Sequence, residues 1–288
     1  MKKILLLLAL FFLANPCFAI KIGLLVDTED VPLGTSVKGT IIDANTNHTI
    51  FDMEAMKGYE LKPYNNVIAI KIDGKFYKIN SDNIVIKTLD TGYVCTKSKW
   101  YRGILIVQNK GGKLTVINDV SIEDYIKGVV PAEMPAGWET EAHKAQAVAA
   151  RSYAVANLGK RASLGFDLKD TPEDQAYGGA SAETAKTNKA VEDTKGIVLT
   201  YDMKVITAYY SASAGGKSVS ASDVWGGNLP YLRSVPSFDD NVKKNGHGVG
   251  MSQHGANNLA KQGYNAYQIL QYFYKDVTFA RLNPEYYN

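Results

Sequence analysis

The 288-residue sequence has few cysteines and little net charge. Of its 2 Cys residues, Cys17 lies in the N-terminal leader described below, which leaves Cys95 alone. A chain with a single cysteine has neither an internal disulfide nor a cysteine-based metal cluster. The formal net charge is +3, and loss of the lysines Lys2 and Lys3 lowers it to +1, with no basic block in the remainder. This composition gives no support for nucleic-acid binding.

Long hydrophobic runs are also missing, with one exception at the N-terminus. Ile4–Leu13 is an unbroken apolar run that follows Lys2 and Lys3. The run is too short to span a bilayer comfortably, and small residues precede a cut after Ala19, as in a secretory signal peptide. We therefore predict a signal peptide over 1–19 and an extracytoplasmic mature chain, secreted or associated with the cell wall, without a membrane span.

The residues after the leader predict an α+β fold. From Ile20 to about Asn118 short apolar runs alternate with turn signals such as Asp73-Gly74, which is typical of strands. Ile104–Val107 and Lys113–Asn118 read as a hairpin. We predict a β-rich N-terminal part over 20–100 and a mixed domain of helices and β-hairpins over 101–288.

Helix signals begin near Ser121. Ser121-Ile122-Glu123-Asp124 resembles a capping box and predicts a short helix to Val130, followed by a rigid loop over Pro131–Pro135. A long helix is predicted from about Glu139 to Leu158, ended by Gly159. Further predictions are helices over 181–194, 252–262 and 266–274, and a hairpin over 197–211.

Glu133 is the first candidate for chemistry. It lies between Pro131 and Pro135, and the apolar neighbours Val130 and Met134 would desolvate it. Desolvation raises the pKa of a carboxyl group, as a general acid near neutral pH requires. The spacing alone is also compatible with a surface glutamate on a loop.

Two histidines near a glycine-rich loop are the second candidates. His247 lies within Gly246–Gly250, and His254 lies near the start of a predicted helix. Such a loop can hold an anion or a sugar hydroxyl through backbone N–H groups, or it can simply be a tight turn. Zinc is disfavoured because no cysteine or H-E-x-x-H pattern lies nearby. A serine nucleophile at Ser252 is disfavoured because its surroundings lack the last glycine of a nucleophile elbow.

The long helix adds polar candidates. Lys144 and Arg151 are seven residues apart and share one face, while Gln146 and Tyr153 share another. These side chains could contact a carbohydrate, or they could form an ordinary solvated face. Walker and Rossmann motifs are missing from the sequence, so no nucleotide cofactor is predicted.

Several motifs resemble the SpoIID/LytB domain family, and they occur in the order typical of that family. They cover about 102–279. The matching segments are Val120–Pro135, Glu141–Tyr153, Tyr177-Gly178-Gly179, Thr194-Lys195-Gly196, Ala214-Gly215-Gly216, Asp223-Val224-Trp225-Gly226, Pro230-Tyr231-Leu232 and Gly246–Gln253.

The resemblance implies a peptidoglycan lytic transglycosylase. In the sporulation enzyme of the family the catalytic acid is the glutamate of the Glu-Met-Pro motif, which is Glu133 here. Such an enzyme cleaves the bond between N-acetylmuramic acid (MurNAc) and N-acetylglucosamine (GlcNAc) and leaves 1,6-anhydro ends. The resemblance further implies a groove that binds the glycan strand, and the residues expected to line it are Gln146, Arg151, Ser213, His247 and Gln253.

The same resemblance leaves other functions open. LytB is described as an enhancer of an amidase, so a non-catalytic, glycan-binding partner of a cell-wall amidase is the alternative. A hydrolytic muramidase would need a second carboxylate, for which Glu139, Glu141, Asp223 and Asp239 are available. Some relatives bind zinc near the Gly-Gly hairpin, but Ser211 and Ala214 occupy that stretch here, so we predict no metal and no cofactor.

Overall fold

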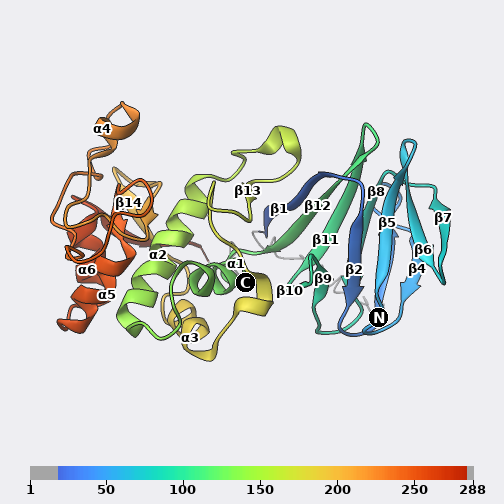
Figure 1. Cartoon of the computed structure of the whole chain (residues 1–288), viewed down its shortest axis with the longest axis horizontal. Helices are drawn as coiled ribbons and strands as arrows, with labels where there is room; N and C mark the ends of the chain where they lie inside the picture. Colours follow the sequence, from blue (N-terminus) through green and yellow to red (C-terminus); the bar gives the residue numbers. More distant parts are fainter. Residues whose placement is uncertain (1–18, 284–288) are drawn as a thin grey trace, which may run out of the picture.

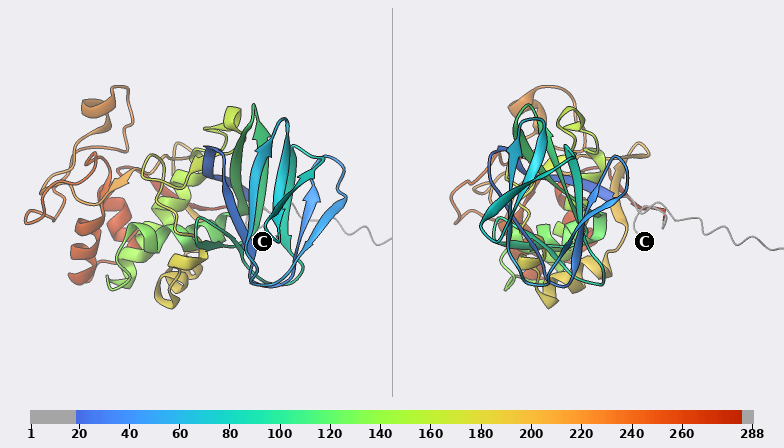
Figure 2. Two further views of the ribbon diagram at one scale, coloured as in Figure 1. Left: turned by 45° about the vertical axis from the view of Figure 1, so that its right-hand side comes forward. Right: turned by 90° about the vertical axis from the view of Figure 1, so that its right-hand side faces the viewer.

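The computed structural model describes residues 19–283 and has an α+β fold, as predicted. The molecule is elongated, with strands at one end and helices at the other (Figure 1; Figure 2). The predicted signal peptide falls almost entirely on residues 1–18, outside the described residues. Within 19–283, no helix combines the length and the apolar character that crossing a membrane requires.

Two sheets form most of the β-rich end, and their strands pair antiparallel except for one short parallel pair at the edge of the larger sheet. Residues 104–109 alternate between half-buried and buried, as expected where one face of a strand packs on a core, whereas residues 114–118 are all buried. The larger sheet, in spatial order, consists of β13 (Leu168–Lys169), β1 (Ala19–Thr28), β12 (Lys113–Ser121), β11 (Ile104–Lys110), β8 (Asn83–Thr88), β3 (Gly39–Asp43) and β4 (Thr49–Met53). The second consists of β10 (Lys99–Tyr101), β9 (Val94–Thr96), β2 (Val31–Thr35), β5 (Tyr59–Tyr64), β6 (Val67–Ile72) and β7 (Lys75–Ile79).

The predicted hairpin is confirmed as β11 and β12, in a register that places Ile106 opposite Ile117. β12 also pairs with β1, and β11 with β8. The large sheet therefore continues to Ser121 and crosses the predicted division at residue 100. That division stays a prediction, but residues on both sides of it share one hydrophobic core.

The helical end is built around a central helix, α2 (Thr140–Ala156), which confirms the predicted long helix. Alanines on its opposite sides belong to two hydrophobic clusters: Ala147 and Ala150 pack toward the sheets, and Ala142 and Ala145 pack toward the C-terminal helices. Small side chains let neighbouring elements approach α2 closely. The other helices are α1 (Ile122–Glu133), α3 (Ala185–Asp193), α4 (Ala221–Trp225), α5 (Gln253–Lys261) and α6 (Ala266–Phe273).

Short strands connect these helices. One small sheet contains β15 (Lys204–Val205), β14 (Ile197–Tyr201) and β18 (Thr278–Arg281), and another contains β16 (Tyr210–Ser211) and β17 (Met251–Ser252). The predicted hairpin over 197–211 is confirmed only for β14 and β15. The strand after it, β16, instead pairs in parallel with β17, immediately before α5.

The predicted loop over Pro131–Pro135 is wrong in its first half. Ser121 caps α1 as expected, accepting a hydrogen bond from the Asp124 amide. The helix then continues through Pro131 and ends at Glu133. Proline removes only its own N–H donor, and near a helix end this costs one backbone hydrogen bond. The next bond, from the Met134 amide to the Val130 carbonyl, closes the last turn.

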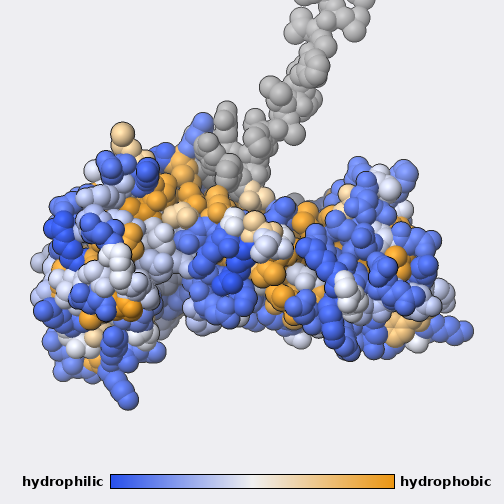
Figure 3. Space-filling model, turned by 90° about the horizontal axis from the view of Figure 1, so that it is seen from above, coloured by the Kyte–Doolittle hydropathy of each residue, from blue (hydrophilic) through white to orange (hydrophobic). Residues whose placement is uncertain are grey.

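The surface seen from above is mostly hydrophilic, and hydrophobic residues gather toward the middle of the molecule (Figure 3). An apolar hollow of about 400 Å³ lies where the start of β1, the end of α2 and Leu282 meet. A polar cleft, described next, lies at the helical end.

Candidate functional site

A cleft of about 560 Å³ opens where the end of α1 meets α2, β16 and two loops. It is larger and more polar than the apolar hollow, with charged, amide and aromatic side chains together on its walls. Its lining residues are Ala132, Glu133, Tyr153, Lys160, Pro172, Glu173, Asp174, Ala176, Tyr209, Tyr210, Ser211, Ala212, Trp225, Asn245, Gly246, His247 and Gln253.

Glu133 lies in the cleft and accepts hydrogen bonds from three uncharged donors. Its Oε1 accepts from the Ala176 amide at 2.7 Å and from the Tyr210 hydroxyl at 3.4 Å. Its Oε2 accepts from Gln253 Nε2 at 3.2 Å. A carboxylate offers about four acceptor positions, so one position on Oε2 remains for a proton.

A chain of hydrogen bonds holds the tyrosine beside Glu133 in place. Gln175 Nε2 donates to the Tyr210 hydroxyl at 2.8 Å, and the Tyr125 hydroxyl donates to Gln175 Oε1 at 3.2 Å. Burial raises the pKa of Tyr210 well above its usual value, so its hydroxyl stays protonated and available as a donor. Through the Tyr210 hydroxyl, this network helps to fix the orientation of the Glu133 carboxyl group.

Burial raises the pKa of Glu133, and the hydrogen bonds from Ala176, Gln253 and Tyr210 offset this only in part. Among the described residues, no cation forms an ion pair with Glu133 that would lower the pKa again. The raised pKa expected from the sequence is thus confirmed. A carboxyl group that keeps its proton toward neutral pH can act as a general acid.

Glu133→Gln should stabilise the fold at neutral pH. Because the folded-state pKa of Glu133 is raised, the folded protein holds the neutral acid more favourably than the carboxylate. The contribution of Glu133 to the free energy of unfolding is therefore complete below its ordinary pKa of 4.5 and is lost as the pH rises through the raised pKa. Glutamine stays neutral throughout. The free energy of unfolding of the variant, measured by urea titration, should equal that of the parent at pH 4 or below and exceed it at about pH 7 to 8. Equal stability at every pH would contradict the raised pKa.

Two other residues predicted to line the groove do lie in the cleft. Gln253 is the first residue of α5 and contacts Glu133 directly. His247 accepts a hydrogen bond from the Val249 amide at its Nδ1, at 2.9 Å. Burial, together with the charge of Lys244, lowers the pKa of His247, so its ring is neutral at pH 7.

The structure does not place Gln146, Arg151 or Ser213 on the cleft wall, so their prediction as groove-lining residues is wrong. All three side chains are fully buried. Ser213 donates to the Lys243 carbonyl at 2.7 Å and holds the segment that leads to the cleft residue Asn245. Gln146 is one of the buried residues of α2.

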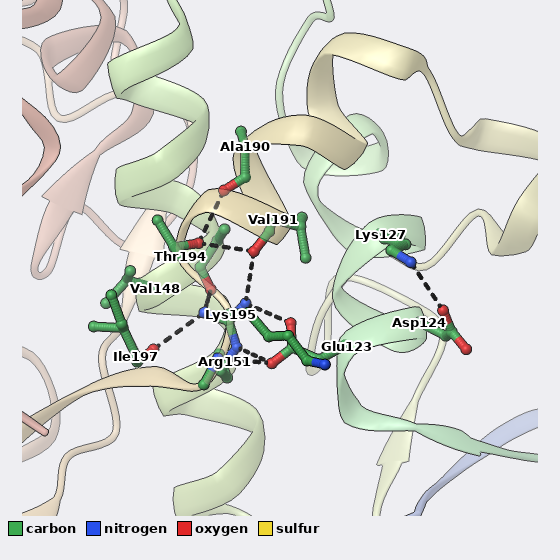
Figure 4. Close-up of polar contacts among 12 residues, drawn as sticks. Glu123, Asp124, Lys127, Val148, Arg151, Ala190, Val191, Thr194, Lys195 and Ile197 are labelled. Atoms are coloured by element: carbon green, nitrogen blue, oxygen red, sulfur yellow. Dashed lines mark hydrogen bonds and ion pairs between the residues drawn. The ribbon is translucent and has the colours of Figure 1, made fainter. Parts of the chain in front are cut away.

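Arg151 instead forms a buried ion pair with Glu123 of α1 (Figure 4). Its Nε and Nη2 atoms contact the two carboxylate oxygens at 2.9 and 2.7 Å. Nη1 donates to the Ile197 carbonyl at 3.1 Å, and the Gly196 amide donates to Glu123 at 3.0 Å. The pair therefore joins α1, α2 and the start of β14, and its role is structural.

The four carboxylates considered for hydrolysis all lie outside the cleft lining. Asp239 is buried and accepts from the Ala214 and Gly216 amides and from two serines. Burial alone would raise the pKa of Asp239, but these hydrogen bonds outweigh it and lower the pKa. Glu141 accepts from the Ala266 amide, Asp223 accepts from Ser220 and Ser222, and Glu139 precedes α2 as its N-cap residue.

The cleft does contain two other carboxylates, and both are paired with cations. Asp174 contacts Lys160 at 2.6 Å and Arg161 at 2.7 Å. Burial opposes ionisation of Asp174, but these contacts prevail and lower its pKa. Glu173 contacts Lys169 at 2.7 Å. Across residues 19–283, no three His, Cys, Asp or Glu side chains gather in a way that could hold a metal ion.

Sequence reasoning missed most of the residues around Glu133. None of the sequence motifs contains Ala176, Tyr210 or Gln175, although Tyr177-Gly178-Gly179 and Ala214-Gly215-Gly216 lie close to them in the chain. Trp225 belongs to the motif Asp223-Val224-Trp225-Gly226, which by itself predicts no role for the tryptophan. Their positions in the sequence carry no periodic signal, because Gln175 and Ala176 lie in one loop, Tyr210 in the short strand β16 and Trp225 at the end of α4.

Comparison with known proteins identifies the central part of the chain. The SpoIID family model, described as stage II sporulation protein, matches residues 110–201, which contain α1, α2, α3 and Glu133. An uncharacterised protein of Brachyspira hyodysenteriae is 36% identical over 204 residues, covering 70% of this chain and 51% of the relative.

Two relatives from Bacillus subtilis have functional names. One named amidase enhancer is 49% identical over 107 residues, 37% of this chain and 14% of the relative. One named stage II sporulation protein D is 36% identical over 136 residues, 42% of this chain and 40% of the relative. The chain thus spans about half of the Brachyspira protein and less of these two.

Proposed function

The chain belongs to the SpoIID family, and from this premise we propose that it is a peptidoglycan lytic transglycosylase with Glu133 as its acid and base. The observation that carries the proposal is the state of Glu133. Its carboxyl group lies in an open cleft, accepts hydrogen bonds from neutral donors and has a raised pKa.

One carboxyl group is sufficient for this reaction. Glu133 donates its proton to the glycosidic oxygen while the bond from MurNAc C1 to that oxygen breaks, which releases the next sugar as an alcohol. The MurNAc C6 hydroxyl then bonds to C1 and gives its proton to the Glu133 carboxylate. Atoms and protons balance without water. Because the attack is intramolecular, proximity contributes much of the rate.

The other carboxylates of the cleft favour this reaction over hydrolysis. A hydrolytic glycosidase usually needs a second carboxylate as base or nucleophile. Asp174 forms ion pairs with Lys160 and Arg161, and Glu173 forms one with Lys169. Glu133 is the one carboxyl group of the described cleft that no cation neutralises.

The second candidate function is that of a glycan-binding enhancer of a cell-wall amidase. The relative named amidase enhancer favours it through its 49% identity. In that case the cleft would bind glycan without cleaving it, and the chain would raise the activity of a separate amidase. Both functions require a site outside the cytoplasm, in agreement with the predicted signal peptide.

Product analysis distinguishes these functions. Purified protein is incubated with intact and with peptide-stripped glycan strands, and the products are analysed by mass spectrometry. We expect 1,6-anhydro ends, formed at a rate that falls as the pH rises through the raised pKa of Glu133. Reducing ends would indicate hydrolysis. Glycan binding without cleavage, together with stimulation of an added amidase, would support the enhancer and overturn the transglycosylase.

A further inference from the structure

Trp225 is a large apolar side chain in an exposed segment. It is the last residue of α4, and residues 222–228 are all exposed. The residue keeps 48% of its surface accessible, yet it lines the same cleft as Glu133. The two glycines after it have open space around them.

Aromatic side chains hold the indole ring at the cleft wall. Its centroid lies 4.6 Å from the ring of Tyr209 and 5.2 Å from that of His247. Tyr209 is held in turn by an edge-to-face contact with Tyr153 at 5.8 Å, and its carbonyl accepts from the Tyr274 hydroxyl at 2.8 Å. One part of the indole thus rests on a fixed aromatic wall while about half of it stays free.

The rest of the cleft differs in chemistry. Away from this wall, the cleft is lined by the charged side chains of Lys160, Glu173 and Asp174 and by the carboxyl group of Glu133. The cleft therefore combines an apolar aromatic wall with polar and charged walls. A pyranose ring has the matching shape, because its C–H groups form apolar faces while its hydroxyl and amide groups point outward from the rim.

We propose that Trp225 is the stacking platform of a sugar subsite and binds the face of an N-acetylhexosamine ring of the glycan. This inference rests on the proposed action on glycan strands and adds a residue that determines affinity. Trp225 is not among the hydrogen-bond donors of Glu133 and takes no part in proton transfer. It acts by holding the strand so that a glycosidic oxygen lies at the carboxyl group.

The test measures binding separately from cleavage. In a Glu133→Gln background, the dissociation constant for a soluble GlcNAc oligomer is measured by calorimetry for the parent, Trp225→Ala, Trp225→Phe and Val224→Ala. Val224 is a matched control, since it is exposed on the same short helix but outside the cleft lining. Trp225→Ala should weaken binding about ten-fold, as loss of an aromatic contact and its buried area does. Phenylalanine should restore most of the affinity, and Val224→Ala should change little.

With Glu133 intact, Trp225→Ala should raise KM about ten-fold and leave kcat close to that of the parent, because the platform binds substrate and transition state alike. Unfolding midpoints check that all variants fold. Unchanged binding by Trp225→Ala, equal loss in Val224→Ala, or no oligomer binding by the parent would overturn the platform. Binding that depends on Trp225 without any cleavage would sustain the platform and overturn the transglycosylase instead.

Discussion

Glu133→Gln should lower the rate of glycan cleavage by about 10²–10⁴-fold, the usual contribution of a general acid–base group. The amide keeps the size of the side chain and can still accept the hydrogen bond from the Ala176 amide. It cannot donate a proton to the glycosidic oxygen or accept one from the C6 hydroxyl. The loss should therefore appear in kcat, and glycan binding should persist.

The measurement is the initial rate of release of anhydro products, with Glu192→Gln as the control. Glu192 is an exposed carboxyl residue on α3, outside the cleft lining, and its variant should cleave at the parent rate. Because Glu133→Gln should be at least as stable as the parent at neutral pH, unfolding cannot account for its inactivity. Near-normal cleavage by this variant would refute the assigned role of Glu133.

Arg151→Ala should lower the free energy of unfolding by about 3–5 kcal/mol, the cost of removing one partner from a buried ion pair. Both residues of the pair are buried, and the guanidinium group is fully enclosed. Its loss would leave the Glu123 carboxylate buried without the guanidinium group that contacts both of its oxygens. Urea unfolding at neutral pH, followed by circular dichroism, measures the effect.

Two further variants separate the ion pair from other causes. Lys144→Ala removes the lysine two turns earlier on α2, whose pairs with Glu141 and Asp193 are partly exposed. It should cost about 0–1 kcal/mol. The double variant Glu123→Leu with Arg151→Met should recover much of the loss, because apolar side chains can replace a buried pair. A small effect of Arg151→Ala would show that the pair contributes little.

Local signals in the sequence predicted the elements of the fold well. The Ser121 cap, the bounds of α2 and the hairpin of β11 and β12 all depend on residues close together in the chain. The helix through Pro131 was missed because the packing of Val129 and Val130 in the core outweighs the preference of proline for a helix end.

The surroundings of Glu133 depend on distant parts of the chain. Its donors Ala176, Tyr210 and Gln253 lie 43, 77 and 120 residues away in the sequence. Arg151 was predicted to be accessible because it shares a helical face with Lys144. Its burial depends on Glu123, 28 residues earlier, and helical periodicity carries no information on such a pairing.

Continuation of α1 through Pro131 affects more than the shape of the backbone. The aligned peptide dipoles of a helix produce a partial negative charge at its C-terminal end, and Glu133 is the last residue of α1. An ionised carboxylate at that end is repelled by the backbone itself, so the helix favours the neutral acid. Acidity at this position is therefore set partly by the peptide groups of α1, and a glutamate elsewhere on the cleft wall would not share that influence.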